Sequence, residues 1–221
     1  HHSSEVLNQL TSDEQQLLHQ GLMLYLRGLR HHHLQQGFTI RPLQLEDEAA
    51  IAQVIREVSA EHGLTADRGY GVADPELDHL FPLYQGAGRA YWVITDPQGK
   101  ILGGGGIAPL QGAKESVCEL QKMYFLPQLR GKGLGRRLIL QALTFARESG
   151  YQSCYLETTA VLNRATHLYQ QLGFHHLESP LGNTGHCGCE IRMSLDLGTT
   201  QTTPLPESCE PTCDTSCSCS R

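Results

Sequence analysis

The sequence lacks an excess of positive charge, a long apolar run and a secretory signal, and each absence excludes a class of protein. Its 221 residues carry 17 Lys and Arg against 23 Asp and Glu, a formal net charge of −6, which argues against nucleic acid held chiefly by phosphate neutralisation. No apolar run approaches the roughly 18 residues of a membrane-spanning helix. The N-terminus has no signal-peptide pattern. We therefore expect a cytoplasmic protein with neither a membrane nor a nucleic acid as partner.

The composition is that of an ordinary globular protein, with 39% hydrophobic and 18% charged residues. Such a chain can bury a sizeable core. Its eight cysteines do not indicate a disulfide framework. Cys118 and Cys154 stand in apolar, strand-like runs, where a free buried thiol is the expected state. His1 and His2 resemble the remainder of a purification tag and are set aside.

Residues 1–37 combine this tag remnant with one amphipathic helix that runs from residue 5 to about residue 36. Thr11 and Glu14, three places apart, form a capping box at its start. One helix cannot bury an apolar stripe alone, so it packs on the main domain, on a second copy in a homodimer, or on a preceding domain. We expect the homodimer. The stripe at helical spacing consists of Leu18, Leu22, Tyr25, Leu26 and Leu29.

A main domain from residue 38 to residue 197 alternates strand and helix patterns. This order predicts an α/β or α+β sheet domain with helices on both faces. Residues 198–221 are rich in Thr, Ser, Pro and Cys and have almost nothing to bury, so we expect a dispensable, disordered tail. The predicted strands are 38–42, 91–95, 101–108, 117–126, 153–158, 174–178 and 189–195, and the predicted helices lie around 51–58, 133–148 and 164–172.

The strongest functional signal is the stretch 128–137, which reads Gln-Leu-Arg-Gly-Lys-Gly-Leu-Gly-Arg-Arg between a strand and a helix. Glycines let the backbone turn tightly, so that successive N–H groups at the helix start can hold an anion. The spacing fits neither the dinucleotide-binding loop nor the Walker loop. The stretch predicts a pyrophosphate cradle, with a glycine-rich connection that binds nothing as the alternative.

Two motifs that follow one another along the chain resemble those of a known family. Arg130-x-x-Gly133-x-Gly135, after a strand ending at 122–127, resembles the acetyl-CoA signature of the GNAT N-acetyltransferase family. The opening 40–42 also fits, so the resemblance covers about residues 38–197. The second motif, similar to the family's strand and helix after the signature, consists of Leu156-Glu157-Thr158, Asn163 and Ala165-x-x-Leu168-Tyr169-x-x-Leu172-Gly173-Phe174.

The resemblance implies a GNAT-like bent mixed sheet in which two parallel strands, ending near Phe125 and Thr158, splay apart and admit acetyl-CoA. The strand edge at 123–125 would bond the pantetheine amides, and the N–H groups of 131–136 would hold the pyrophosphate. Arg136 and Arg137 would pair with phosphates or remain solvated helix charges. The implied cofactor-binding residues are Met123, Tyr124, Phe125, Arg130, Gly131, Lys132, Gly133, Leu134, Gly135, Arg136 and Asn163.

The implied reaction is direct attack of a neutral amine on acetyl-CoA, which acts as a co-substrate. The acceptor would be a small amine or an amino-acid-like molecule. Glu119 is the candidate base, with a salt-bridged strand carboxylate as the alternative reading and Glu157 as a weaker candidate. Strict alternation would place Gln121, Met123 and Phe125 on the same strand face as Glu119.

Tyr169 is the candidate general acid for the departing thiolate, and a core tyrosine is the alternative reading. Asn163 could equally be the N-cap of its helix. The four glycines at 103–106 would weaken a strand, so they predict a bulge there, beside the acceptor pocket or for packing alone. The loop at 61–88 is expected to cover the acceptor but carries no recognisable pocket code.

No metal is expected in the site. The histidines at 31–33 are consecutive and point in different directions on a helix, whereas metal ligands converge. His186 with Cys187 and Cys189 lacks a fourth ligand nearby, and the tail cysteines lack zinc-finger spacing.

A regulatory module is the alternative function. Residues 6–16 and the helix that follows are similar to the C-terminal dimerisation helices of MarR-type transcription factors, some of which are fused to a GNAT domain. The main domain would then sense acyl-CoA. Turnover of acetyl-CoA with amines separates the two functions.

Overall fold

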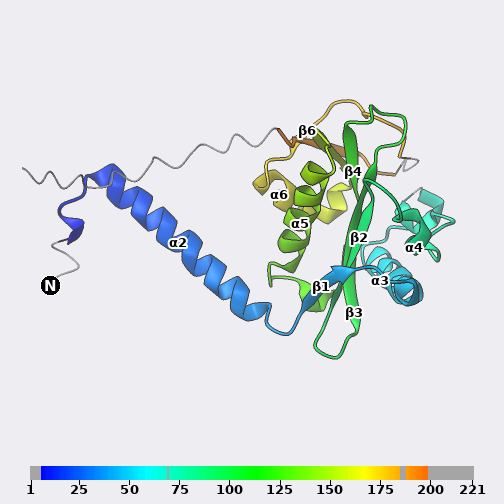
Figure 1. Cartoon of the computed structure of the whole chain (residues 1–221), viewed down its shortest axis with the longest axis horizontal. Helices are drawn as coiled ribbons and strands as arrows, with labels where there is room; N and C mark the ends of the chain where they lie inside the picture. Colours follow the sequence, from blue (N-terminus) through cyan, green and yellow to red (C-terminus); the bar gives the residue numbers. More distant parts are fainter. Residues whose placement is uncertain (1–5, 69, 185–187, 199–221) are drawn as a thin grey trace, which may run out of the picture.

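The computed structural model describes residues 6–68, 70–184 and 188–198. The predictions made for His1 and His2, for His186 and Cys187, and for the tail beyond residue 198 lie outside these ranges. A long N-terminal helix precedes a sheet flanked by helices (Figure 1). No helix among the described residues is both long and apolar enough to cross a membrane.

The sheet is mixed, as predicted. Its strand order is β1-β2-β3-β4-β5-β7-β6, and β4 and β5 are its parallel pair, whereas the other neighbours run antiparallel. The strands are β1 (Thr39–Pro42), β2 (Ala90–Thr95), β3 (Ile101–Pro109), β4 (Val117–Phe125), β5 (Ser153–Thr158), β6 (His175–His176) and β7 (Ile191–Asp196).

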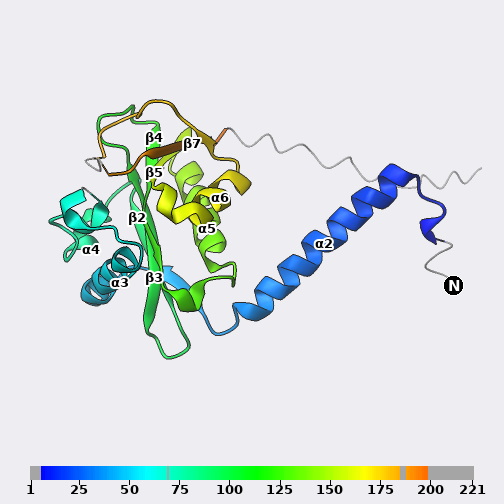
Figure 2. The same cartoon turned by 180° about the vertical axis from the view of Figure 1, so that it is seen from behind.

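Helices cover both faces of the sheet. Figures 1 and 2 show α3 and α4 on one face and α5 and α6 on the other. The segment after α3, predicted as a loop, contains two short 3-10 helices and α4. The helices are α2 (Ser12–Leu34), α3 (Glu48–Glu61), α4 (Leu80–Leu83), α5 (Leu134–Glu148) and α6 (Asn163–Gln171), and the 3-10 helices are η1 (Leu45–Asp47), η2 (Ala66–Arg68), η3 (Gly71–Ala73), η4 (Pro127–Leu129) and η5 (Ala160–Leu162).

The four glycines of β3 lie where both faces of the sheet are densely packed. A Cβ at Gly104 would approach Cδ1 of Ile51 in α3 to 3.0 Å, and a Cβ at Gly106 would approach Cε1 of Tyr84 to 2.7 Å. On the opposite face, a Cβ at Gly105 would collide with the sulfur of Met123. The glycines therefore allow bulky neighbours to pack against the middle of the sheet.

A β-bulge lies opposite these glycines, but its extra residue belongs to β4. Gly104 is opposite Tyr124 and Gly106 is opposite Gln121, so three steps on β4 face two steps on β3. Lys122, within the bulge, has a φ of 51° and is the one non-glycine residue with positive φ among the described residues. The hydroxyl of Tyr91 donates to its carbonyl oxygen at 3.1 Å. The predicted bulge is present, with its backbone distortion in the neighbouring strand.

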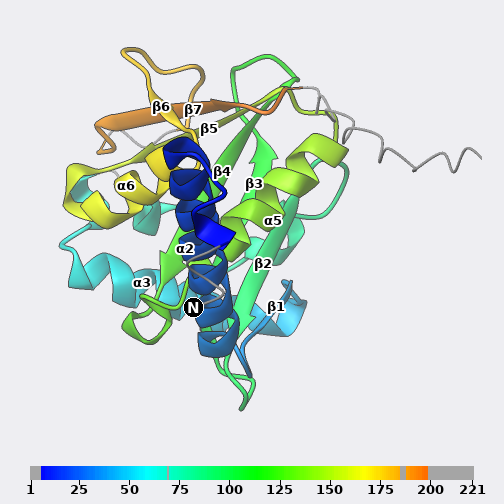
Figure 3. The same cartoon turned by 90° about the vertical axis from the view of Figure 1, so that its left-hand side faces the viewer.

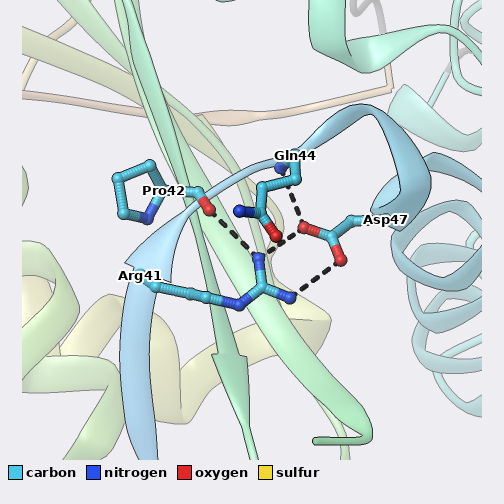
Figure 4. A network of polar contacts seen from close by, with 4 residues as sticks. All are labelled: Arg41, Pro42, Gln44 and Asp47. Carbon is cyan, nitrogen blue, oxygen red and sulfur yellow. Dashed lines mark hydrogen bonds and ion pairs between the residues drawn. The ribbon is translucent and has the colours of Figure 1, made fainter.

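A buried ion pair fixes the start of α3 to the end of β1 (Figure 4). The Arg41 guanidinium donates to both carboxylate oxygens of Asp47, at 2.6 and 2.9 Å. The same carboxylate accepts from the backbone N–H of Gln44 at 2.8 Å, and Arg41 also donates to the carbonyl of Pro42. The hydrogen bond from Arg41 lowers the pKa of Asp47, despite its burial.

Helix α2 projects away from the sheet and contacts the domain only near its C-terminal end (Figures 1 and 3). Its predicted capping box is present, because the N–H of Glu14 donates to the Thr11 hydroxyl and the Glu14 carboxylate accepts from the N–H of Thr11. No residue of α2 is buried, so its stripe does not pack on the main domain. Apart from Leu34 at its end, the large apolar residues of α2 are between 47% and 70% exposed, namely Leu17, Leu18, Leu22, Met23, Leu24, Tyr25, Leu26 and Leu29.

Candidate active site

The parallel strands β4 and β5 pair with each other over only part of their length. They pair at Val117 with Ser153, at Cys118 with Cys154 and at Glu119 with Tyr155. Beyond this point β4 continues to Phe125 and β5 continues to Thr158 without pairing with each other. The facing backbone edges are therefore available to an extended ligand. This is the fork that the sequence predicts, with Glu119 in its last paired position.

The fork opens into a cleft of about 890 Å³. Its walls come from the end of β4, the glycine turn, the first turns of α5 and α6, and the ends of α2 and α3. Four arginines and two histidines line it, and no Asp or Glu is among the lining residues. A chain of net charge −6 thus forms a cleft that is lined by four arginines and by no carboxylate. Such a cleft suits an anionic ligand.

The predicted glycine turn has the backbone of an anion cradle. Gly131 and Gly133 have φ of 75° and 74°, in the left-handed region that other residues rarely adopt. Gly133 is the N-cap of α5, so the N–H groups of the first helical turn have no acceptor within the helix. A Cβ at Gly135 would lie 3.2 Å from the Phe125 ring, which explains a third glycine on the helix side.

Most of the residues predicted to bind the cofactor line this one cleft, and three positions differ. Leu134 is fully buried in the core, so it can offer only its backbone. Lys132 is not a lining residue, and its ammonium lies over the Phe38 ring, 5.8 Å from the centroid. Arg137 does not line the cleft either, and donates to Oε1 of Gln35 at 3.4 Å. The predicted residues that line the cleft are Met123, Tyr124, Phe125, Arg130, Gly131, Gly133, Gly135, Arg136, Asn163 and Tyr169.

Arg130, the first residue of the signature, is engaged within the protein. Its guanidinium donates to both carboxylate oxygens of Glu61 at 2.6 Å and to the carbonyl of Phe125 at 3.4 Å. This ion pair lowers the pKa of Glu61 and joins the end of α3 to the glycine turn. Arg130 therefore holds the turn in place in this structure.

Tyr169 is buried on α6 and reaches the cleft. Its ring makes an edge contact with Phe174, with centroids 5.8 Å apart. Burial raises the pKa of Tyr169 well above its ordinary value, and nearby Tyr124 and Cys154 act in the same direction. Burial likewise raises the pKa of Tyr124 to about 12. Both phenols are protonated at neutral pH and can donate hydrogen bonds.

Glu119 is 5% exposed and is not among the residues that line the cleft. Its carboxylate accepts from the Gln121 amide at 2.6 Å, and that amide's oxygen accepts from the Tyr84 hydroxyl at 2.9 Å. The expectation that Met123 and Phe125 share a face with Glu119 is wrong. Because the bulge at Lys122 shifts the alternation by one residue, both side chains lie on the α5 side, whereas Gln121 contacts Tyr84 on the α3 and α4 side.

Two further predictions are resolved by local geometry. Glu157 accepts from the Tyr155 hydroxyl at 2.6 Å and from the Thr184 hydroxyl at 2.5 Å, so the weaker base candidate is held by two donors. Asn163 is the first residue of α6, whose N-cap is Leu162, so the N-cap interpretation of Asn163 is wrong. Among the described residues, no group of three or more His, Cys, Asp or Glu side chains gathers as a metal site. The prediction of a site without metal stays a prediction.

Several residues of the cleft were not predicted from the sequence. His62 follows α3, and Arg164 stands in the first turn of α6 beside the predicted Asn163. Arg27 and His31 come from α2, about a hundred residues before the glycine turn. Their positive character was visible in the sequence, but their place in the cleft depends on long-range packing.

Comparison with known proteins identifies the family. Residues 57–174 match the acetyltransferase (GNAT) family. An uncharacterized N-acetyltransferase of Escherichia coli, YjgM, is 57% identical over 162 residues, which cover 73% of this chain and 96% of that protein. The chain belongs to the GNAT family. It is an N-acetyltransferase by this membership, as the two motifs predicted.

Other relatives and solved structures agree with this assignment. N-acetylaspartate synthetase of Xenopus tropicalis is 38% identical to this GNAT protein over 91 residues, 41% of this chain and 32% of that enzyme. A GNAT acetyltransferase of Staphylococcus aureus shares the fold with a TM-score of 0.64 at 17% identity, covering 73% of this chain and 99% of that one. A Salmonella typhimurium acetyltransferase, solved with its cofactor acetyl-CoA, has a TM-score of 0.58 at 20% identity and covers 79% of this chain and all of that one. These relatives give no support to the MarR-like reading of the N-terminal helix.

Proposed function

We propose that this GNAT protein transfers the acetyl group of acetyl-CoA to the amine of a small, amino-acid-like acceptor by direct attack. The observation that carries the proposal is the fork between β4 and β5, which opens into a cleft with a glycine turn and a cationic lining. These features fit the cofactor, because an unpaired strand edge suits pantetheine amides and a helix start behind a glycine turn suits phosphates. Bound acetyl-CoA would supply the acyl thioester.

Glu119 takes the proton from the attacking amine. With an amine pKa near 10.4, only about one molecule in two thousand is uncharged at pH 7, so a proton acceptor speeds the reaction. The position of Glu119 at the last paired residue of the fork supports this role. The amide of Gln121 holds the carboxylate in one orientation.

Tyr169 donates to the departing sulfur. A phenol with a raised pKa keeps its proton at neutral pH, so the donor is present before the thiolate forms. From ordinary pKa values of about 10 and 8.5, complete transfer to the thiolate is uphill by at least about 2 kcal/mol. The hydrogen bond from Tyr169 is therefore most useful while negative charge builds on the sulfur.

The acceptor end of the fork carries the opposite charge from the cofactor cleft. Burial raises the pKa of Cys189, and the nearby carboxylates of Glu157, Glu190 and Glu119 act in the same direction, so that this pKa reaches about 12. Carboxylates in this position attract an acceptor that arrives as an ammonium ion. The 38% identity with N-acetylaspartate synthetase over part of the chain supports an amino-acid-like acceptor.

Two measurements on the full chain test the proposal. Calorimetry gives the affinity for CoA, and release of free thiol from acetyl-CoA is followed with a panel of amino acids, including aspartate, and simple amines. We expect CoA to bind and at least one α-amino acid to stimulate thiol release. Failure to bind CoA would refute the proposal. Tight binding without turnover by any amine would instead favour the sensing module.

A further inference from the structure

Helix α2 precedes the part of the chain that matches the family, yet it contributes an arginine and a histidine to the cleft. We propose that Arg27 and His31 of α2 bind the phosphate groups of the cofactor, so that α2 forms one wall of the site. This inference rests on the CoA binding proposed above. It assigns a role to a helix that the family comparison leaves without one.

The C-terminal end of α2 is attached to the glycine turn by specific contacts. The Gln35 side-chain amide donates to the carbonyl of Lys132 at 3.0 Å and accepts from Arg137 at 3.4 Å. The His31 ring lies directly against Gly133, because a Cβ at Gly133 would be 2.7 Å from its Nδ1. The C-terminal end of α2 therefore contacts the same glycine turn whose N–H groups can hold an anion.

Arg27 and His31 are four residues apart, so they share one face of α2. Both line the cleft together with Gly131 and Gly133. Arg30 is exposed on the same helix and is not among the lining residues. The helix therefore presents Arg27 and His31 to the cleft and leaves a second arginine outside it.

The charge balance explains why the cleft benefits from this pair. Arg130 is neutralised by Glu61, so its charge is not fully available to a ligand. The C-terminal end of α2 also carries partial negative charge on its last carbonyl groups, which alone would repel a phosphate. The guanidinium of Arg27 reverses the sign at this end of the cleft, and the imidazole of His31 adds a hydrogen-bond donor. A guanidinium in particular recognises phosphate oxygens through paired hydrogen bonds.

The test compares ligands that differ in their phosphates. Calorimetry on the full chain measures CoA and dephospho-CoA, which lacks the 3′-phosphate, and an NMR titration measures pantetheine, which has no phosphate. We expect Arg27→Ala and His31→Ala each to weaken CoA about ten- to hundredfold, the loss of a hydrogen bond to a charged group, and to leave pantetheine unchanged. Arg30→Ala is the matched control and should leave all three affinities unchanged.

The outcomes separate this inference from the function on which it rests. If the alanine variants also bind dephospho-CoA more weakly than the unaltered protein does, the contact is to the pyrophosphate. If they bind dephospho-CoA with unchanged affinity, the contact is to the 3′-phosphate. Either result supports the proposal. Unchanged or tighter CoA binding by both variants refutes it, as does an equal loss of affinity for pantetheine. If the unaltered protein binds no CoA, the proposed function itself fails. Arg27→Lys should recover part of the affinity, and equal melting temperatures would show that the variants are folded.

Discussion

Gly133→Ala tests whether the glycine turn holds the cofactor. Gly133 has a φ of 74°, and the left-handed region costs a residue with a Cβ about 1 to 2 kcal/mol. The new Cβ would also lie 2.7 Å from Nδ1 of His31, so that ring must shift by several tenths of an ångström. Since the side chain can move, we expect most of the loss in unfolding free energy to come from the backbone. For a chain of this size the melting temperature should fall by about 2 to 8 °C.

Binding should respond more strongly than stability. Gly133 is the N-cap of α5, so a change in its backbone angles re-aims the N–H groups of the first helical turn. We expect the affinity for CoA to fall at least about tenfold, and Gly133→Val, with its branched side chain, should abolish binding while the protein still folds. Calorimetry with CoA and a thermal melt of the same samples give the two quantities.

Gly150 provides the matched control at the other end of α5. Its φ is 87°, and a Cβ there would meet no atom within 4 Å. Gly150→Ala therefore introduces the same kind of backbone strain, far from the cleft, and should lower the melting temperature without changing the affinity for CoA. Equal CoA affinities for Gly133→Ala and Gly150→Ala would refute the assignment of the turn as the pyrophosphate site.

Four more outcomes follow from the structure. Tyr169→Phe keeps the ring but removes its hydroxyl, so turnover should fall about 10²- to 10⁴-fold while the affinity for CoA stays nearly unchanged. If turnover stays near normal while chemistry is rate-limiting, Tyr169 is a core residue and not the acid. Glu119→Gln should flatten the rise of the rate with pH, whereas an unchanged profile would exclude it as the base. Asp47→Asn should lower the unfolding free energy by about 1 to 3 kcal/mol at pH 7 in urea titrations. Because the folded-state pKa of Asp47 is lowered, this contribution is present above about pH 4 and is lost as the pH falls through the folded value, so the difference between the proteins should shrink there. If α2 joins two copies through its apolar stripe, Leu22→Glu should yield a smaller species in light scattering. The control Gln20→Glu, on the opposite face of the helix, should not. Equal masses for the unaltered protein and both variants would exclude this contact.

Local patterns predicted the secondary structure well because they act over a few residues. The predicted bounds of β5, residues 153–158, agree with the structure, and Thr11 with Glu14 identified the capping box of α2. The glycine turn was equally predictable, because its positive φ values and its place before a helix follow from residue type. The part of the cleft formed by the glycine turn was therefore largely predictable.

Features that depend on distant parts of the chain were not predictable. The glycines of β3 predicted a bulge, but its position at Lys122 of β4 depends on the register between the two strands. The pairing of Arg130 with Glu61 spans 69 residues, and no local pattern marks it. The same holds for His31, whose contact with Gly133 depends on how α2 meets the turn.

Strand β4 both pairs within the central sheet and contributes residues to the candidate site. Its pairing with β5 ends at Glu119, and the bulge at Lys122 follows before the strand lines the cleft. Without the bulge, Met123 would share a face with Glu119, because a one-residue shift exchanges the two faces of a strand. With it, Met123 faces α5 while Glu119 stays on the side of Gln121 and Tyr84. One extra residue thus places Met123 and Phe125 on the face of the sheet opposite the proposed base.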